Sequence, residues 1–370
     1  MKFIDEFRDP QAVKTLITQI GTALKGVDPS RQPLQIMEVC GGHTHAIFRF
    51  GLDKLLPEGI EFVHGPGCPV CVLPRGRIDD AVTLARQPGT LLCSYGDAVR
   101  VPGDLGSLLD AKAAGADVRI VYSPLDALAL AKQNPDKQVV FFAIGFETTA
   151  PATALTLRQA RQQGVENFSV LCHHITIGPP LRAILDDPGV RLDGLVAPGH
   201  VSMVVGQSPY QFIVEEYRKP VVIAGFEPID FLTALLGVVR QIADGRAEVE
   251  NAYKRAVQSA GNAVALRAMA EVFTLAPKSD WRGLGAIDQS GLMLSDAFAE
   301  FDAERRFGLK PTQVAEPEGC GCAQVLRGQL RPADCPLFGK ACTPSAPVGA
   351  LMVSSEGACA AYYQYRSPQD

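Results

Sequence analysis

Residues 139–151, VVFFAIGFETTAP, join an apolar run to a Gly-Phe-Glu step and a polar stretch. The run from Val139 to Ile144 has the length of a buried β-strand, and a helix is expected after the Gly-Phe-Glu step. A second stretch, VVIAGFEPID at 221–230, repeats this order of strand, Gly-Phe-Glu and expected helix. The repeat is consistent with two related α/β halves, and equally with strand-to-helix junctions that recur in any α/β fold.

Outward from these two stretches, short apolar runs alternate with amphipathic stretches of helical length. The first expected helix begins at Pro10, with Asp9 as its capping residue. The expected strands are 34–39, 61–64, 90–93, 118–122, 138–144, 168–171, 194–196 and 220–224. Strands that alternate with helices predict an α/β fold with parallel sheets.

The domain organisation follows from this pattern and from a change of composition near the C-terminus. We expect two parallel-sheet α/β domains, at 1–135 and 136–248, and a third segment at 249–370. In that third segment the strands are expected to stop, with a helical stretch that continues to Phe273. After about residue 275 the chain is rich in Gly, Pro and Cys, which predicts a small loop-rich module that needs a metal to hold it together.

Composition and charge narrow the class of protein. The chain has 370 residues, 47% of them hydrophobic, and a net charge of −5. This charge gives no support for a nucleic-acid partner, and no apolar stretch reaches the roughly 18 residues of a membrane span. The N-terminus mixes acids and bases and does not resemble a secretory signal. We therefore expect a cytoplasmic protein whose ten cysteines serve as metal ligands or redox groups rather than as disulfide staples.

The first cysteine motif is Cys40-Gly-Gly-His43-Thr-His45. A thiolate and a neighbouring imidazole suit iron, copper or zinc, and the two glycines let the backbone wrap closely around an ion. The alternative interpretation is a flexible loop that carries an ordinary buried cysteine.

The second motif, Gly-Pro-Gly-Cys68-Pro-Val-Cys71, has the Cys-x-x-Cys spacing of dithiol redox centres and of half a zinc site. A zinc site requires a second pair of ligands, so we favour a redox dithiol in an exposed Gly- and Pro-rich loop. Pro74 delays the next helix to about Arg75.

Five cysteines form the third group, and they lie in a segment that has few large apolar residues. Four thiolates can hold either a [4Fe–4S] cluster or a structural zinc ion. The wide, non-repeating spacing favours the cluster, because zinc ribbons have two short knuckles. The five residues are Cys320, Cys322, Cys335, Cys342 and Cys359. Cys93 and Cys172 lie inside apolar runs and are expected to be ordinary buried thiols.

Several polar motifs follow directly after expected strands. In open α/β sheets ligands bind at the carboxyl ends of strands, so these loops are candidates for one shared cleft. Glu147 either caps the helix that follows or contributes hydrogen bonds and proton transfer in that cleft. The same ambiguity applies to His173, His174, His200 and Ser202.

Taken together, these motifs resemble the HypD family of [NiFe]-hydrogenase maturation proteins. The resemblance covers essentially the whole chain and keeps the family's order of motifs. The matching segments are MEVCGGHTHAI (37–47), HGPGCPVCVLP (64–74), AIGFETTAP (143–151), CHHITIGPP (172–180), APGHVSMVVG (197–206) and the cysteine-containing tail (318–363).

The resemblance implies a scaffold for assembly of the Fe(CN)2CO unit of the hydrogenase active site, rather than a conventional turnover enzyme. It implies two partners, a HypC-type small chaperone and a HypE-type cyanide donor. Cys40 would be the iron-binding thiolate, with His43 close to it, and Cys68 and Cys71 would form the redox dithiol. The [4Fe–4S] cluster would be held by Cys320, Cys335, Cys342 and Cys359, with Cys322 as the competitor of the first.

Two other functions remain open on the sequence. One is a stand-alone iron–sulfur thiol/disulfide oxidoreductase that acts on a small disulfide substrate. The other is a zinc-stabilised binding protein.

Overall fold

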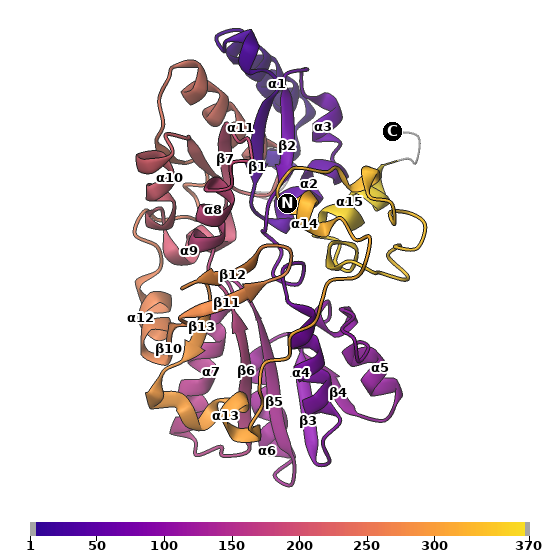
Figure 1. Ribbon diagram of the computed structural model, residues 1–370. Helices are drawn as coiled ribbons and strands as arrows, with labels where there is room; N and C mark the ends of the chain where they lie inside the picture. The colour runs from indigo at the N-terminus through magenta and orange to yellow at the C-terminus, as the bar shows by residue number, and fades with distance from the viewer. Residues whose placement is uncertain (1–4, 367–370) are drawn as a thin grey trace.

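The computed structural model of the chain describes residues 5–366. Its strands form two parallel sheets, one in the upper and one in the lower half of Figure 1, with a β-hairpin between them. The helix expected near the N-terminus is α1 (Pro10–Leu24), and the side chain of Asp9 accepts a hydrogen bond from the backbone N–H of Ala12. The predicted α/β class with parallel sheets is confirmed.

The five-stranded sheet has the strand order β2-β1-β7-β8-β9. Its strands are β1 (Leu34–Glu38), β2 (Ile60–His64), β7 (Gly194–Pro198), β8 (Val221–Ala224) and β9 (Val249–Asn251). The direction of winding reverses between β1 and β7, where Ile36 pairs with Gly194. Such a switch point opens a crevice at the carboxyl ends of the two strands, and Cys40 and His200 follow these two ends.

The four-stranded sheet has the order β4-β3-β5-β6. Its strands are β3 (Thr90–Ser94), β4 (Asp117–Ile120), β5 (Gln138–Gly145) and β6 (Phe168–His174). Along β5 the side chains alternate between two cores, with Phe141 in one and Phe142 in the other, both fully buried. Helices cover both faces of such a sheet, which is why β5 is an unbroken apolar run in the sequence.

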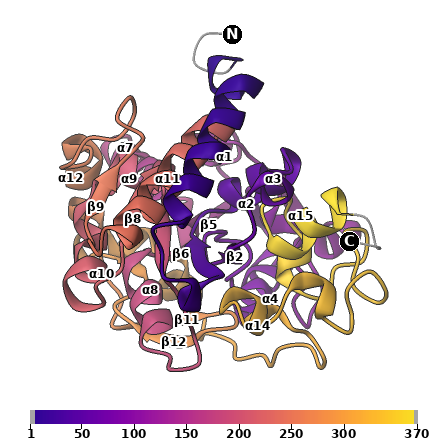
Figure 2. The ribbon, with the colours of Figure 1, turned by 90° about the horizontal axis from the view of Figure 1, so that it is seen from above.

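Helices pack on both sheets and connect their strands. Figure 2 shows α1 beside α11 on one face of the five-stranded sheet. The helices are α1 (Pro10–Leu24), α2 (Gly41–Arg49), α3 (Leu52–Leu55), α4 (Arg75–Ala85), α5 (Leu108–Ala113), α6 (Pro124–Gln133), α7 (Ala150–Gln162), α8 (Gly178–Leu185), α9 (Gly199–Val205), α10 (Gln211–Glu216), α11 (Pro228–Ala243), α12 (Ala263–Val272), α13 (Ala303–Phe307), α14 (Cys322–Leu326) and α15 (Ala358–Tyr365).

The segment after residue 249 differs from the prediction. The chain was expected to be helical from 249 to 273, but β9 is a strand at the edge of the five-stranded sheet and α12 begins only at Ala263. The expected loop region after residue 275 also contains strands. β10 (Phe273–Leu275) pairs with β13 (Leu292–Leu294), and β11 (Lys278–Trp281) forms a hairpin with β12 (Gly285–Asp288). These strands are short and partly exposed, so they leave no apolar run in the sequence.

The sheets do not follow the predicted division near residue 135. β1 and β2 precede this boundary, whereas β7, β8 and β9 in the same sheet follow it. The four-stranded sheet likewise takes β3 and β4 from one side and β5 and β6 from the other. Hydrophobic runs reveal strands, but the order of strands in a sheet depends on pairing over long sequence separations.

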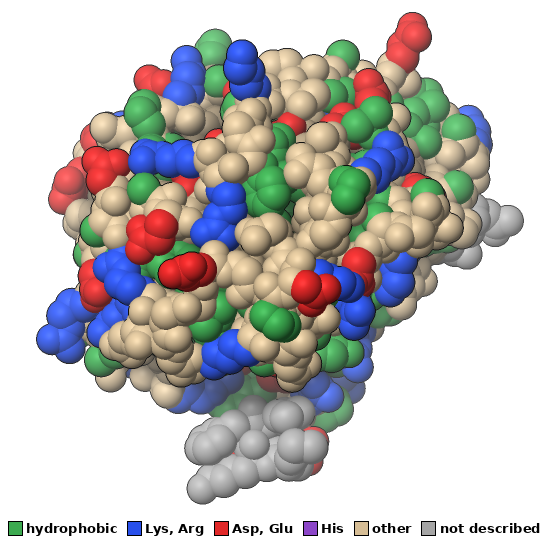
Figure 3. Space-filling model, turned by 90° about the horizontal axis from the view of Figure 1, so that it is seen from below, with side chains coloured by type: hydrophobic (Ala, Val, Ile, Leu, Met, Phe, Trp, Pro, Cys, Tyr) green, Lys and Arg blue, Asp and Glu red, His purple; other side chains and the backbone are tan. Residues whose placement is uncertain are grey.

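No helix in the described part of the chain is long and apolar enough to cross a membrane. On the face of the molecule in Figure 3, acidic and basic side chains are interspersed. This mixture is what 35 basic and 40 acidic residues lead us to expect.

Candidate functional site

Cys40 lies where strand β1 passes into helix α2. It has extended backbone angles and occupies the capping position of α2, which opens with Gly41 and Gly42. The parallel strand β2 ends beside it, and Gly41 N donates a hydrogen bond of 3.4 Å to Gly67 O in the following loop. A side chain at position 67 would overlap the backbone of Cys40, so only glycine lets the two cysteine loops lie this close.

The buried carboxylate of Glu38 stabilises the Cys40 loop through hydrogen bonds. It accepts hydrogen bonds from Cys40 N at 3.0 Å, from the hydroxyl of Thr44, and from Nδ1 of His64 at 2.8 Å. Because a buried carboxylate is costly without partners, these three bonds hold the loop in one conformation. The sequence prediction did not include Glu38 or His64, and their only signal was that both lie at the ends of neighbouring strands.

His43 is fully buried behind Cys40. Its Nε2 lies 3.0 Å from Gly225 O, and a carbonyl only accepts, so Nε2 carries the proton. Nδ1 therefore has a free lone pair, and it has no hydrogen-bond partner in the part of the chain that the structure describes. Burial lowers the pKa of His43 and keeps the ring neutral. The ring stacks on Phe226, whose ring also contacts His200 at 3.9 Å between centroids.

Glu38 and His43 are fully buried, whereas Cys40 as a whole residue is only partly buried. Burial, followed by the negative charges of Glu356 and Glu38, raises its pKa to about 12. The thiol is thus protonated at neutral pH in the metal-free protein. A metal cation bound here would displace that proton and compensate the nearby carboxylates.

Cys68 and Cys71 form a disulfide, with their Cα atoms 5.2 Å apart. The prediction of an exposed setting is wrong, because the two residues are 5% and 1% exposed. They lie between the two sheets in a loop packed against the Cys40 loop. Helix α4 starts at Arg75 directly after this loop, as expected.

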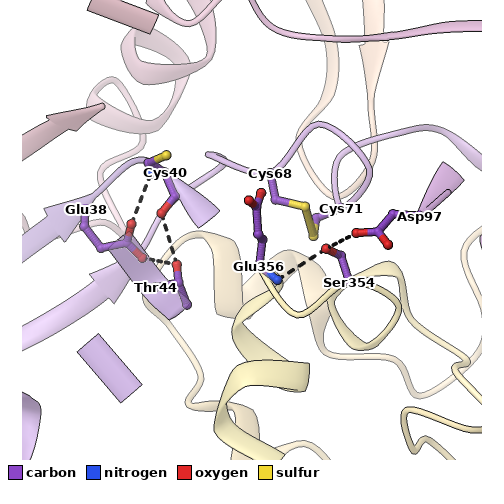
Figure 4. The surroundings of a disulfide bond; sticks show 8 residues. All are labelled: Glu38, Cys40, Thr44, Cys68, Cys71, Asp97, Ser354 and Glu356. Atoms are coloured by element: carbon purple, nitrogen blue, oxygen red, sulfur yellow. Dashed lines mark hydrogen bonds between the residues drawn. A yellow bond between two sulfur atoms is a disulfide. The ribbon is translucent and has the colours of Figure 1, made fainter. Parts of the chain in front are cut away.

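Glu356 connects these two motifs to the C-terminal segment (Figure 4). Gly41 packs directly against Glu356, and in Figure 4 the Glu356 side chain lies between Cys40 and the disulfide. Its backbone N–H donates to Ser354 Oγ at 3.3 Å, and Ser354 in turn donates to Asp97 at 2.7 Å. Burial, with the charges of Asp97 and Glu38, raises the pKa of Glu356. The sequence prediction did not single out Glu356.

All five C-terminal cysteines line one small cavity. The cavity is closed by Leu337, Phe338, Gly349 and Met352, and its cysteines are Cys320, Cys322, Cys335, Cys342 and Cys359. Cys359 belongs to α15, which packs against α2, so this cavity lies close to the Cys40 loop.

Cys322 interacts with two other thiols of this cavity, Cys320 and Cys359. The neighbouring Cys322 thiol, together with burial, raises the pKa of Cys320. A side chain at Gly349 would lie 2.5 Å from the Cys322 sulfur and 2.7 Å from the Cys320 sulfur, so the wall of the cavity is shaped around these sulfurs.

The donor set fits an iron–sulfur cluster, since thiolates are its usual ligands. Within residues 5–366, no three His, Cys, Asp or Glu side chains converge as they do around a single metal ion. The cysteine-lined cavity, rather than a preformed ion site, is therefore the feature that fits the cluster. Cys320 and Cys322 both reach it, so the geometry leaves the fourth ligand open between them.

Glu147 lies apart from the cysteines and is 5% exposed. It does not cap α7, where Thr149 occupies the capping position. Its Oε1 accepts a hydrogen bond of 3.0 Å from Ile177 N, and Oε2 has no partner among the described residues. Burial raises the pKa of Glu147 to about 7. Burial also raises the pKa of Tyr210, whose hydroxyl lies 3.1 Å from Ser202 Oγ.

The remaining candidates have structural partners or lie elsewhere. His174 contacts Thr153 Oγ1 at 2.9 Å, and Ser202 donates to Pro198 O at 2.8 Å. His173 is buried and lines a separate cavity together with Cys172. Cys172 is only partly buried, contrary to expectation, whereas Cys93 is buried as predicted.

The candidate residues follow strands of both sheets. Cys40, His43, Cys68, Cys71 and Glu356 come together at the five-stranded sheet. Glu147 and the histidine pair belong to the four-stranded sheet.

This fold and site define a class: parallel α/β proteins that place a free thiol, a buried disulfide and a cysteine-lined cavity next to one another. The model of the HypD family, described as the hydrogenase formation hypA family, matches residues 11–366. The chain is 56% identical to the hydrogenase maturation factor HypD of Rhodobacter capsulatus, covering 99% of this chain and 98% of the relative. It is 53% identical to the factor of the same name from Escherichia coli K12, covering 100% and 99%. The chain belongs to the HypD family of hydrogenase maturation factors.

Proposed function

We propose that this chain is the cytoplasmic scaffold on which the Fe(CN)2CO unit of a [NiFe]-hydrogenase is assembled. In this proposal it works with a HypC-type small chaperone and a HypE-type cyanide donor. The observation that carries the proposal is the packing of Glu356 against the Cys40 loop, beside the Cys68–Cys71 disulfide. This contact brings a metal-binding thiol, a redox pair and the cysteine-lined cavity into one region.

Cys40 has the properties of an anchor for iron that is later handed over. A thiolate is a soft ligand that suits low-valent iron with cyanide and carbonyl ligands. Cys40 as a residue is only partly buried, so its loop can meet a partner protein that shares the same metal. The free Nδ1 lone pair of neutral His43 offers a neighbouring acceptor or ligand. A single thiolate makes a more labile site than a closed set of four ligands.

The disulfide and the cavity have a redox role in this proposal. Reduction of the Cys68–Cys71 disulfide to two thiols consumes two electrons and two protons. A [4Fe–4S] cluster, when bound, supplies electrons one at a time from an external one-electron donor. The burial of both sulfurs favours this internal role over the thiol/disulfide oxidoreductase alternative, in which a small disulfide substrate must reach a sulfur directly.

The test of the anchor is Cys40→Ser, which nearly keeps the shape but replaces a soft ligand with a hard, weakly acidic hydroxyl. We expect the purified variant to keep its C-terminal iron and sulfide and to lose the cyanide and carbonyl infrared bands, with loss of hydrogenase maturation. Cys93→Ser is the matched control, because Cys93 is a buried thiol of strand β3. Full infrared bands on Cys40→Ser would refute the anchor.

The cavity is tested by metal analysis of protein purified without oxygen. We expect iron and acid-labile sulfide in a ratio near one, with a broad visible absorption. Cys342→Ala should remove both and loosen the C-terminal segment, because Cys342 is one of the thiols that line the cavity. Stoichiometric zinc without sulfide in the wild type would instead support the zinc-stabilised alternative.

A further inference from the structure

Arg282 is a buried arginine at the turn of the β11–β12 hairpin, between the two sheets (Figure 1). The hairpin is held in place by Trp281, whose indole N–H donates to Ser290 Oγ at 2.8 Å and whose ring contacts Phe146. The position of the turn is therefore set by aromatic packing against the four-stranded sheet. No motif in the sequence indicated a functional role for this residue.

The guanidinium of Arg282 is only partly satisfied. The residue is 3% exposed, and its Nε donates to Glu316 at 2.7 Å. Nη1 and Nη2 are both buried and have no hydrogen-bond partner within the described chain. A buried cation with four unused N–H bonds is costly, and it requires an acceptor, preferably an anionic one.

The surroundings of Arg282 indicate where this acceptor lies. Gly283 packs against Ala323 in the first turn of α14, the residue after Cys322. The carboxylate that Arg282 Nε contacts, Glu316, precedes Cys320 by four residues. The turn therefore packs against the segment in which Cys320 and Cys322 enter the cysteine-lined cavity.

The same residue contacts the redox pair through its backbone. Arg282 N donates a hydrogen bond of 2.8 Å to Val72 O, and Val72 directly follows Cys71. One hairpin turn thus contacts the disulfide loop through the main chain of Arg282 and the start of α14 through Gly283.

We propose that the Arg282 guanidinium is the cation that hydrogen-bonds to and stabilises the anionic iron–sulfur group held by the C-terminal cysteines. The inference rests on the proposed function, because it requires the cluster. In this proposal Arg282 acts by changing the reduction potential of the cluster. Reduction adds negative charge to the cluster, so a nearby buried cation favours the reduced form and raises the potential.

The experiment uses the full chain with its cluster, purified without oxygen, and measures the cluster's midpoint potential by electron paramagnetic resonance during a redox titration. Arg282→Gln removes the charge and should shift the midpoint to a more negative potential. Arg282→Lys keeps the charge and should recover part of the wild-type value. Glu316→Gln removes the neighbouring negative charge, so its midpoint should shift in the opposite direction, to a less negative potential.

The matched control is Arg331→Gln, which removes an arginine from the same module. Its side chain is 71% exposed, so solvent screens its charge and the midpoint should stay unchanged. General damage to the module would shift Arg282→Gln and Glu316→Gln in the same direction, which overturns the proposal. If Arg282→Gln retains no cluster, Glu316→Gln decides: a shift to a less negative potential supports the proposal, and an unchanged midpoint overturns it.

Two results distinguish the presence of the cluster from the role of Arg282. A wild-type protein without iron and sulfide overturns the cluster itself and, with it, the role of Arg282. A wild-type protein that contains the cluster, with the same midpoint in all the Arg282 and Glu316 variants, overturns only the role of Arg282.

Discussion

Gly145-Phe146-Glu147 and Gly225-Phe226-Glu227 have the same three residues at equivalent places in the two sheets. The first follows β5 and leads into α7, and the second follows β8 and leads into α11. In both, the phenylalanine turns toward an aromatic neighbour. Phe146 packs on Trp281 of the hairpin, whereas Phe226 lies between His43 and His200 beside the Cys40 loop.

The glutamates differ far more than the phenylalanines. Glu147 is buried, with one carboxylate oxygen that has no partner among residues 5–366. Glu227 is partly exposed, occupies the capping position of α11 and pairs with Arg8 through both carboxylate oxygens. The local sequence therefore determines the strand-to-helix junction, while the segment packed opposite determines what the side chains do. Glu147 meets the backbone of Ile177, whereas Glu227 meets Arg8 of the N-terminal segment.

The largest expected difference between the two junctions is how much the packing of each phenylalanine stabilises the fold. Phe146 is 3% exposed, so Phe146→Ala should lower the free energy of unfolding by about 3–5 kcal/mol, which includes the cavity left behind. Phe226 is only partly buried, so Phe226→Ala should cost clearly less. Urea unfolding of both variants measures the difference. Equal losses would mean that the two junctions are packed alike, contrary to the comparison.

The second contrast concerns the buried carboxyl group of Glu147. Its folded-state pKa is raised from 4.5 to about 7, so between these pH values the folded protein binds a proton that the unfolded chain has released. The free energy of unfolding therefore falls as pH rises through this window, and the loss is complete above about pH 7.

Glu147→Gln removes this penalty. It should be more stable than the wild type by about 3 kcal/mol at pH 8, with little difference at pH 4, since one pKa unit corresponds to about 1.4 kcal/mol. Urea unfolding at several pH values tests this, with Glu227→Gln as the control at the equivalent position. A stability difference that does not change with pH would show that Glu147 is ionised at little cost in the folded protein.

The sequence was most informative where both faces of a strand are buried. β5 and β8 are continuous apolar runs, and their bounds agree with the prediction to within a residue. β9 has no such run, because it is held at the sheet edge by backbone pairing with β8. Local composition does not encode that pairing, and the same reason explains why the order of strands could not be predicted.

In the candidate site, the cysteines were found because their spacing carries chemical information. The residues around them were not. Glu356 and Arg282 lie more than 200 residues from Cys40 in the sequence, in a region expected to be loop. Glu38 precedes Cys40 by only two residues, but its role depends on burial and on hydrogen bonds that its residue type does not indicate. The burial of the disulfide was mispredicted for the same reason, because Gly and Pro indicate a turn but do not show what covers it.

The smallest change in stability is expected for Glu227→Gln. Its dependence on salt distinguishes it from the change in Glu147→Gln. Glu227→Gln weakens the pair with Arg8, whose side chain is 39% exposed, so the loss of stability should be small. Because solvent screens exposed charges, this loss should shrink further between about 0.1 and 1 M salt, over which the Debye length falls from about 10 to 3 Å. The difference between Glu147→Gln and the wild type at pH 8 should persist over the same range, since a buried carboxylate is penalised by desolvation rather than by ionic interactions. Urea midpoints at both salt concentrations measure the two changes in stability. If the loss in Glu227→Gln does not depend on salt, it originates in the helix cap rather than in the pair with Arg8.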